Sequence, residues 1–122
     1  MPQTKPTLII GATPNPTRYA FKAANMLLDF DHSVVLYGIK KGEIRGITIQ
    51  NEWPSNESID TITLYINPKL QVQLYENILR LAPKRIIFNP GTENDELVKL
   101  ANENGIEALY ACTLVLLQTN QY

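Results

Sequence analysis

The chain has 122 residues, of which 44% are hydrophobic and 19% charged, and its net charge is −1 at pH 7. This length suits one domain over residues 1–122, and the charge excludes a general nucleic-acid binder, which needs a basic excess. No apolar run approaches the roughly 20 residues of a membrane span, and the single cysteine, Cys112, cannot form an intrachain disulfide, so we expect a cytoplasmic protein without nucleic-acid or membrane partners.

The beginning of the chain predicts a strand, a loop and a helix. In residues 7–10, Thr7 is followed by three consecutive apolar residues, which suits a strand covered on both faces. The loop GATPNPT follows, and we expect a helix over residues 16–30. Asn15 is a good N-cap for this helix, and Pro16 fits its first position, where a backbone N–H is not needed.

The rest of the chain continues to alternate short β-branched runs with segments of helical period, which is typical of βαβ units. Ile47 and Ile49 alternate with polar neighbours and predict a short edge strand or hairpin arm. The apolar tail at residues 113–117 leaves strand and helix open. The other expected elements are strands at residues 33–37, 61–66, 85–88 and 106–110, and helices over residues 68–82 and 92–104.

These elements predict an α/β fold, a Rossmann-like doubly wound parallel sheet of five core strands in three α/β/α layers. Right-handed crossovers favour the strand order 3-2-1-4-5, in which residues 61–66 are strand 3. Ligands of such sheets bind beyond the carboxyl ends of the strands, at the switch point, which this order places between strands 1 and 4. The loops that follow the strands are therefore the expected ligand site.

The loop at residues 11–19 carries the most information about that ligand. A helix N-terminus attracts phosphate, because its first amides are unpaired and its dipole is positive there. Gly11 permits the tight turn out of the strand, Thr13 and Asn15 add side-chain donors, and Arg18 adds a fixed cation. A well-capped strand-to-helix turn is the alternative, but capping alone needs neither Thr13 nor Arg18. The loop therefore predicts phosphate binding.

The end of the second strand narrows the choice of nucleotide. The fingerprint Gly-x-Gly-x-x-Gly is absent, since only Gly11 of its glycines is present. NAD recognition also needs an acidic residue near the end of this strand, where the sequence has Lys40 and Lys41. A lysine pair suits a ribose that carries a phosphate, as in coenzyme A or NADP. Solvated loop charges are the alternative explanation of the pair.

Three segments of the chain resemble a known family: IIGATPNPTRYA at residues 9–20, KKGEIRG at residues 40–46 and NPGTENDELVKLANENGIE at residues 89–107. In order and spacing they are similar to the small stand-alone CoA-binding proteins related to the CoA-binding domain of the succinyl-CoA synthetase alpha subunit. The chain departs from that family's pattern at Gly38-Ile39, where an Asn-Pro pair is usual, and over residues 50–59.

The resemblance implies that the chain binds coenzyme A or an acyl-CoA through its ADP and phosphate moiety at the carboxyl edge of the sheet. The ligase relatives use a phosphorylated histidine that is carried on a second domain. This chain has neither that domain nor a suitable histidine, so the resemblance implies binding without catalysis. With the lysine pair included, the expected binding residues are Gly11, Ala12, Thr13, Asn15, Arg18, Lys40, Lys41, Asn67, Asn89, Pro90 and Gly91.

Other functions stay open at this point. One is an NADP-linked redox enzyme or sensor, and another is a degenerate nucleotide-binding fold that serves as a protein-interaction domain. No catalytic set is evident: His32 is expected in a surface turn at the amino-terminal edge of the sheet, and nothing in the sequence activates Cys112. No metal-ligand spacing is present either. Trp53-Pro54 is the candidate contact for a second copy of the chain or another protein.

Overall fold

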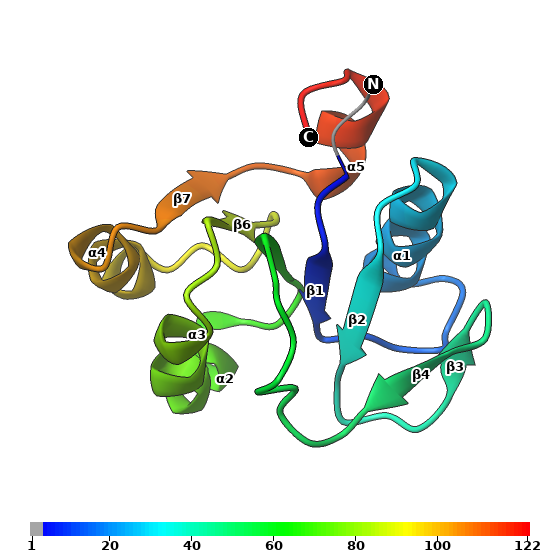
Figure 1. The fold of residues 1–122 in the computed structure, drawn as a ribbon, viewed down its shortest axis with the longest axis horizontal. Coiled ribbons are helices and arrows are strands. Elements are labelled where there is room, and N and C mark those ends of the chain that lie inside the picture. Colours follow the sequence, from blue (N-terminus) through cyan, green and yellow to red (C-terminus); the bar gives the residue numbers. More distant parts are fainter. Residues whose placement is uncertain (1–3) are drawn as a thin grey trace.

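The computed structural model describes residues 4–122, whose strands form one sheet flanked by helices (Figure 1). The strands are β1 Thr7–Ile10, β2 Val34–Tyr37, β3 Glu43–Ile44, β4 Ile47–Gln50, β5 Thr61–Leu64, β6 Arg85–Phe88 and β7 Glu107–Tyr110. Their order in the described residues is β3-β4-β2-β1-β5-β6-β7. The pairs are parallel except β3 with β4, which form an antiparallel hairpin at one edge.

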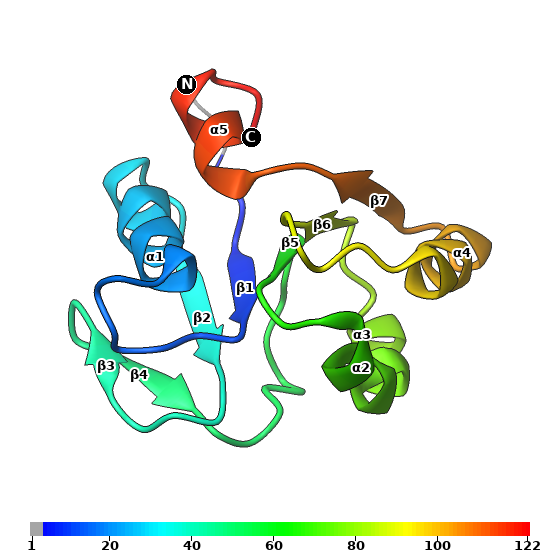
Figure 2. The same cartoon turned by 180° about the vertical axis from the view of Figure 1, so that it is seen from behind.

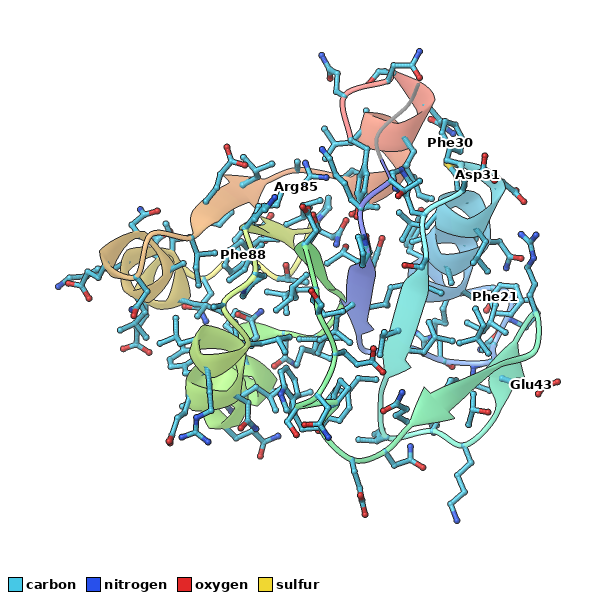
Figure 3. The ribbon with its side chains drawn as sticks, in the orientation of Figure 1. Phe21, Phe30, Asp31, Glu43, Arg85 and Phe88 are labelled. Carbon is cyan, nitrogen blue, oxygen red and sulfur yellow. The ribbon has the colours of Figure 1, made fainter. Side chains whose placement is uncertain are left out.

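The helices lie on both faces of this sheet, so the expected three layers are confirmed (Figures 1 and 2). They are α1 Tyr19–Asp29, α2 Pro68–Gln71, the 3-10 turn η1 Val72–Leu74, α3 Tyr75–Leu81, α4 Asp95–Glu103 and α5 Thr113–Gln118. Ile9 packs with α1 and α5, whereas Leu8 packs with α3 and α4. Phe88, which is fully buried, belongs to the second group (Figure 3). The uninterrupted apolar strand thus contributes to both cores.

The Rossmann-like α/β class is confirmed, but the expected strand order 3-2-1-4-5 and the count of five strands are wrong. Residues 61–64 form β5, which pairs with β1 rather than with β2. The place beside β2 belongs to β4, which pairs Leu36 with Ile49. β5 is buried at every position, as a central strand must be, whereas β4 alternates buried and exposed positions as an edge strand does. The switch point consequently lies between β1 and β5.

Helix α1 begins one turn later than expected, because Asn15 closes a turn of its own. The Asn15 side-chain oxygen accepts hydrogen bonds from the Thr17 amide at 3.0 Å and the Thr17 hydroxyl at 2.8 Å. Such local bonds of Asn compete with helix formation. The N-cap of α1 is therefore Arg18, in extended conformation, and not Asn15. Because of this shift, Arg18 lies at the N-terminus of α1.

Two further expectations, on the helix after residue 68 and on His32, are modified by the structure, and the open choice for the apolar tail is decided. The helix expected over residues 68–82 is divided into α2, η1 and α3, and the apolar tail forms the helix α5. The partner contact expected at Trp53-Pro54 stays a prediction: Trp53 is half-buried and packs edge-on against Tyr37 with ring centroids 5.2 Å apart, and Pro54 is buried. His32 is buried as well, with 8% of its surface exposed, and not a surface residue. Within residues 4–122, every helix is too short or too polar to cross a lipid bilayer.

Candidate functional site

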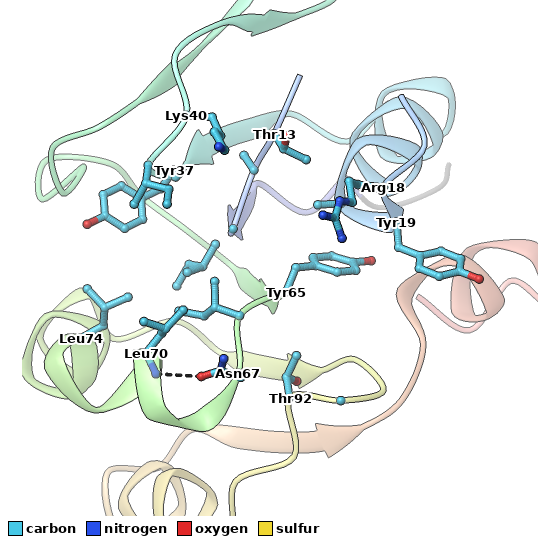
Figure 4. A pocket seen from close by; sticks show the side chains of 18 of the residues that line it. Thr13, Arg18, Tyr19, Tyr37, Lys40, Tyr65, Asn67, Leu70, Leu74 and Thr92 are labelled. Carbon is cyan, nitrogen blue, oxygen red and sulfur yellow. Dashed lines mark hydrogen bonds between the residues drawn. The ribbon is translucent and has the colours of Figure 1, made fainter. Parts of the chain in front are cut away.

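A cavity of about 600 Å³ opens at the carboxyl ends of the central strands. Its walls come from the loops that follow β1, β2, β5 and β6, together with the first turns of α1 and α2 (Figure 4). This volume lies within the range of roughly 300–1,000 Å³ that is usual for sites of small molecules and cofactors. The position agrees with the rule that ligands of doubly wound sheets bind at the switch point, here between β1 and β5.

The first wall of the cavity is the loop after β1, which crosses the end of β2. The amides of Gly11 and Ala12 both donate to the Tyr37 carbonyl oxygen, at 2.9 and 3.0 Å. Gly11 has a φ of +98°, a value that favours glycine. These two amides are consumed by the fold. Any anion in the cavity must therefore use donors further along the chain.

Gly38 allows this crossing. A Cβ at Gly38 would lie 2.4 Å from the Ala12 carbonyl oxygen, so no side chain fits there without moving the loop. The sequence alone marks Gly38 only as the end of a strand and as a departure from the family pattern. The structure shows that it brings the Ala12 turn and Lys40 into one cavity wall.

The N-terminus of α1 supplies the donors that Gly11 and Ala12 lack. Its N-cap residue Arg18 makes no capping bond with its side chain, and no acidic residue lies in the first turn. The first amides of a helix without a cap carry partial positive charge that favours an anion. Thr13, Arg18 and Tyr19 line the cavity around this helix end (Figure 4).

The charge of the lining is one-sided. Among the described residues that line the cavity, Arg18 and Lys40 are cations and no carboxylate is present. Neither of these cations forms an ion pair within residues 4–122. A positive cavity in a chain of net charge −1 is a local feature and not an effect of composition. The cavity therefore suits an anionic ligand.

Asn89 precedes the lining residue Pro90 and holds three elements together. Its side-chain nitrogen donates to the Thr63 hydroxyl at 2.7 Å and to the Leu64 carbonyl at 2.8 Å. Its side-chain oxygen accepts from the Thr113 amide at 2.8 Å. Asn89 is 2% exposed. It joins β5, β6 and the start of α5, so its amide has a structural role.

Gln71 performs the same task between the loops after β5 and β6. Its side-chain nitrogen donates to the carbonyls of Ile66 at 2.9 Å and Thr92 at 2.8 Å, and its oxygen accepts from Asn94 at 2.9 Å. The residue is fully buried. Because Ile66 and Thr92 both line the cavity, Gln71 sets the distance between two of its walls.

Tyr65 lies in the interior of the cavity near Arg18 (Figure 4). Burial raises the pKa of its phenol well above the usual value, against smaller opposing effects of the Thr113 and Thr63 hydroxyls. Tyr65 therefore keeps its proton at neutral pH. It presents an uncharged aromatic side chain to the cavity, and not an anion.

The structure brings most of the predicted binding residues to the cavity. Those that line it are Gly11, Ala12, Thr13, Arg18, Lys40, Asn67, Pro90 and Gly91. Asn15 and Lys41 are exposed outside the lining, and Asn89 is buried outside it. Asn67 caps α2 by accepting a hydrogen bond from the Leu70 amide at 3.1 Å. Cys112 is half-buried at the start of α5 and does not line the cavity.

Sequence reasoning missed the apolar part of the lining. Ile39 is 93% exposed and Leu70 is 48% exposed, yet both line the cavity, as does the buried Leu74. Ile39 was recognisable from its place between Gly38 and Lys40. Leu70 and Leu74 read as one face of a helix, and nothing in that pattern indicates that α2 begins at a cavity. Within the described residues there is no cluster of His, Cys, Asp and Glu side chains that could hold a metal ion.

Several solved structures are similar to this chain. The crystal structure of an uncharacterized protein has 52% sequence identity and a TM-score of 0.97, covering 99% of this chain and 100% of that chain. A hypothetical protein from Pyrococcus horikoshii OT3 has 24% identity and a TM-score of 0.87, covering 96% of this chain and 84% of that chain. No curated protein matches the chain.

One part of a larger enzyme also has this fold. The dinucleotide-forming acetyl-coenzyme A synthetase 1 of Ca. Korarchaeum cryptofilum, in complex with phosphate and ADP, has 15% identity and a TM-score of 0.72. The match covers 87% of this chain and 25% of that chain. The family model described as "CoA binding domain" matches residues 5–118, in agreement with the resemblance seen in the sequence. The chain belongs to the CoA binding domain family.

Proposed function

We propose that the chain binds coenzyme A, or an acyl-CoA, through its ADP and phosphate groups in the cavity at the carboxyl end of the sheet, and that it does not catalyse a reaction on this ligand. The observation that carries the proposal is the charge of the lining, with Arg18 and Lys40 present and no carboxylate among the described residues. Family membership names coenzyme A as the anionic ligand to test.

The diphosphate of the ligand belongs at the N-terminus of α1. The uncapped first turn offers amide donors, Arg18 offers a guanidinium, and the Thr13 hydroxyl lines the same wall. Helix N-termini with a neighbouring Arg bind phosphate by combining the helix dipole with charge-assisted hydrogen bonds. Tyr65 adds an uncharged aromatic ring beside them.

The adenine belongs against the apolar part of the lining. In Figure 4, Leu70 and Leu74 lie at the end of the cavity away from Arg18 and Tyr19. Ile39, at 93% exposure, leaves its apolar surface in water unless something covers it. The flat apolar faces of an adenine ring would cover these side chains and remove their surface from water. Binding of adenine would therefore explain why apolar residues line the cavity beside the cations.

Lys40 is the group that distinguishes coenzyme A from a ligand without a ribose phosphate. It lines the cavity, whereas its neighbour Lys41 is exposed outside the lining. The two lysines therefore make a matched pair of equal charge and different position. Replacement of Lys40 removes a phosphate partner, and replacement of Lys41 removes only a solvated charge.

Calorimetric titration with coenzyme A and dephospho-coenzyme A tests the proposal. We expect coenzyme A to bind more tightly, by about tenfold for one charge-assisted contact. Lys40→Ala should abolish that difference and Lys41→Ala should keep it. The proposal fails if neither ligand binds at millimolar concentration, and the assignment of Lys40 fails if both variants behave alike.

A further inference from the structure

A second pocket lies at the opposite, amino-terminal edge of the sheet, where β1, β5 and β6 begin. It has a volume of about 270 Å³ and is lined by Lys5, Asp60, Lys84, Arg85 and Glu107. Figure 3 shows Arg85 at the start of β6. Nothing in the proposed binding of coenzyme A uses these residues, so the pocket requires its own explanation.

Arg85 is the unusual member of this group, because its charge is buried without a counter-ion. It is 8% exposed, and within residues 4–122 it forms no ion pair. Its Nε donates to the Thr61 hydroxyl at 2.8 Å, and its guanidinium lies 4.3 Å from the centre of the Tyr122 ring. Its Nη2 is buried with no hydrogen-bond partner in the described residues. A buried guanidinium with a free N–H group is suited to bind an anion in the adjoining pocket.

The cation Lys5 and the neutral imidazole of His32 lie near Arg85. Lys5 donates from its ammonium to the Tyr122 main-chain oxygen at 2.8 Å, and its backbone amide donates to His32 Nδ1 at 2.9 Å. Burial and the neighbouring charge of Arg85 lower the pKa of Lys5. Burial, and then Lys5 and Arg85, lower the pKa of His32. The charges of Lys5 and Arg85 thus repel one another, the nearby carboxylates offset this only in part, and an anion would relieve the remaining repulsion.

The two carboxylates of the pocket select the kind of anion. Asp60 accepts a hydrogen bond from the Thr61 hydroxyl at 2.7 Å and lies 3.9 Å from the Lys84 ammonium. Glu107 is exposed and forms no ion pair within residues 4–122. Carboxylates repel a fully ionised anion but accept a hydrogen bond from one that keeps a proton. Hydrogen phosphate keeps a proton at neutral pH, and sulfate does not.

We propose that this pocket binds hydrogen phosphate, with Lys5, Lys84 and Arg85 neutralising its charge and Glu107 accepting its proton in a hydrogen bond, because Asp60 already accepts from Thr61 and lies beside Lys84. The volume of about 270 Å³ holds such an ion together with several waters, each of which occupies about 30 Å³ in the liquid. The site is independent of the coenzyme A cavity, which opens at the other end of the strands.

His32 lies outside the lining of this pocket but reports on it through Lys5, because it is the only histidine in the chain and its Nδ1 accepts from the Lys5 amide. We suggest following its ring protons by NMR while inorganic phosphate or sodium sulfate is added at matched ionic strength. The expected result is a saturable shift with phosphate and a response about tenfold weaker with sulfate, the size of one charge-assisted hydrogen bond. Equal responses to both salts would identify an adventitious ion only, and no response to either would overturn the proposal.

Three variants of the full chain complete this test. Lys84→Ala, whose side chain is 80% exposed and safe to remove, should weaken phosphate binding by about tenfold. Glu107→Gln should bring the affinities for phosphate and sulfate closer together. Arg18→Ala is the control, since it lines only the other cavity, and it should leave the His32 response unchanged. The proposal fails if Lys84→Ala binds phosphate like the original chain, or if Glu107→Gln keeps the full preference for phosphate.

Discussion

Gly38 and Ala12 approach one another so closely that a Cβ on Gly38 would lie 2.4 Å from the Ala12 carbonyl oxygen. The contact joins the end of β2 to the loop after β1, and both segments line the candidate site. The loop is held there by the Gly11 and Ala12 amides, which donate to Tyr37. The geometry of the cavity thus depends on the absence of a side chain at Gly38.

We predict that Gly38→Ala destabilises the chain by about 1–3 kcal/mol, the usual cost of overpacking, and weakens coenzyme A binding as the loop moves away. Chemical unfolding and calorimetric titration measure the two effects. Gly46→Ala is the control: a Cβ there meets no atom within 4 Å, although φ is +84° and contributes backbone strain of its own. Equal ligand affinity in Gly38→Ala and the original chain would show that the contact does not shape the site.

Asn89 provides a prediction about stability. Asn89→Ala leaves the Thr63 hydroxyl, the Leu64 carbonyl and the Thr113 amide without their present partner. Each buried group that loses its hydrogen bond costs about 1–3 kcal/mol, so we expect a loss of at least about 3 kcal/mol in urea unfolding. Asn102→Ala, at an exposed position on α4, should change stability by well under that amount. Similar losses in both variants would contradict the structural role of Asn89.

Gly38 and Gln71 show how far the sequence predicts the structure. The alternation of strands and helices indicates the α/β class, because apolar runs and helical periods are local signals. The sequence shows a glycine at position 38, but it does not show why a glycine is needed there. The need arises from a close backbone contact with Ala12, which is distant in the chain. Likewise, Gln71 looks like any polar residue of a helix, and its bonds to Ile66 and Thr92 appear only in three dimensions.

The error in strand order has a related cause. The alternating pattern of β4 predicts an edge strand or a hairpin arm, and the strand is the arm of a hairpin with β3. What the pattern does not say is that β4 pairs in parallel with β2 and so occupies the position expected for residues 61–66. Right-handed crossovers restrict topology, but they do not tell which strand takes a given edge. In contrast, most residues of the candidate site were predictable, because the loops after the parallel strands meet at the same edge of the sheet, although the switch point itself moved with the strand order.

His32 predicts how stability depends on pH. Its pKa in the folded chain is lowered from 6.5, chiefly by burial, so the unfolded chain binds the proton first as the pH falls. The contribution of His32 to stability is therefore complete above pH 6.5 and is lost as the pH falls from there toward the lowered folded value. His32→Asn keeps an acceptor near Lys5 N–H but does not titrate there. Urea unfolding at several pH values should show a smaller decrease below pH 6.5 in this variant, and identical pH profiles would contradict the assignment.

The most direct test of the proposed function is the affinity of coenzyme A for the original chain, Arg18→Ala and Lys22→Ala, measured by calorimetric titration. Both substitutions remove one exposed cation near the start of α1, but only Arg18 lines the cavity. We predict binding by the original chain, a loss of about tenfold or more in Arg18→Ala, and no change in Lys22→Ala. Equal affinities in all three proteins, or no binding by the original chain at millimolar coenzyme A, would contradict the account.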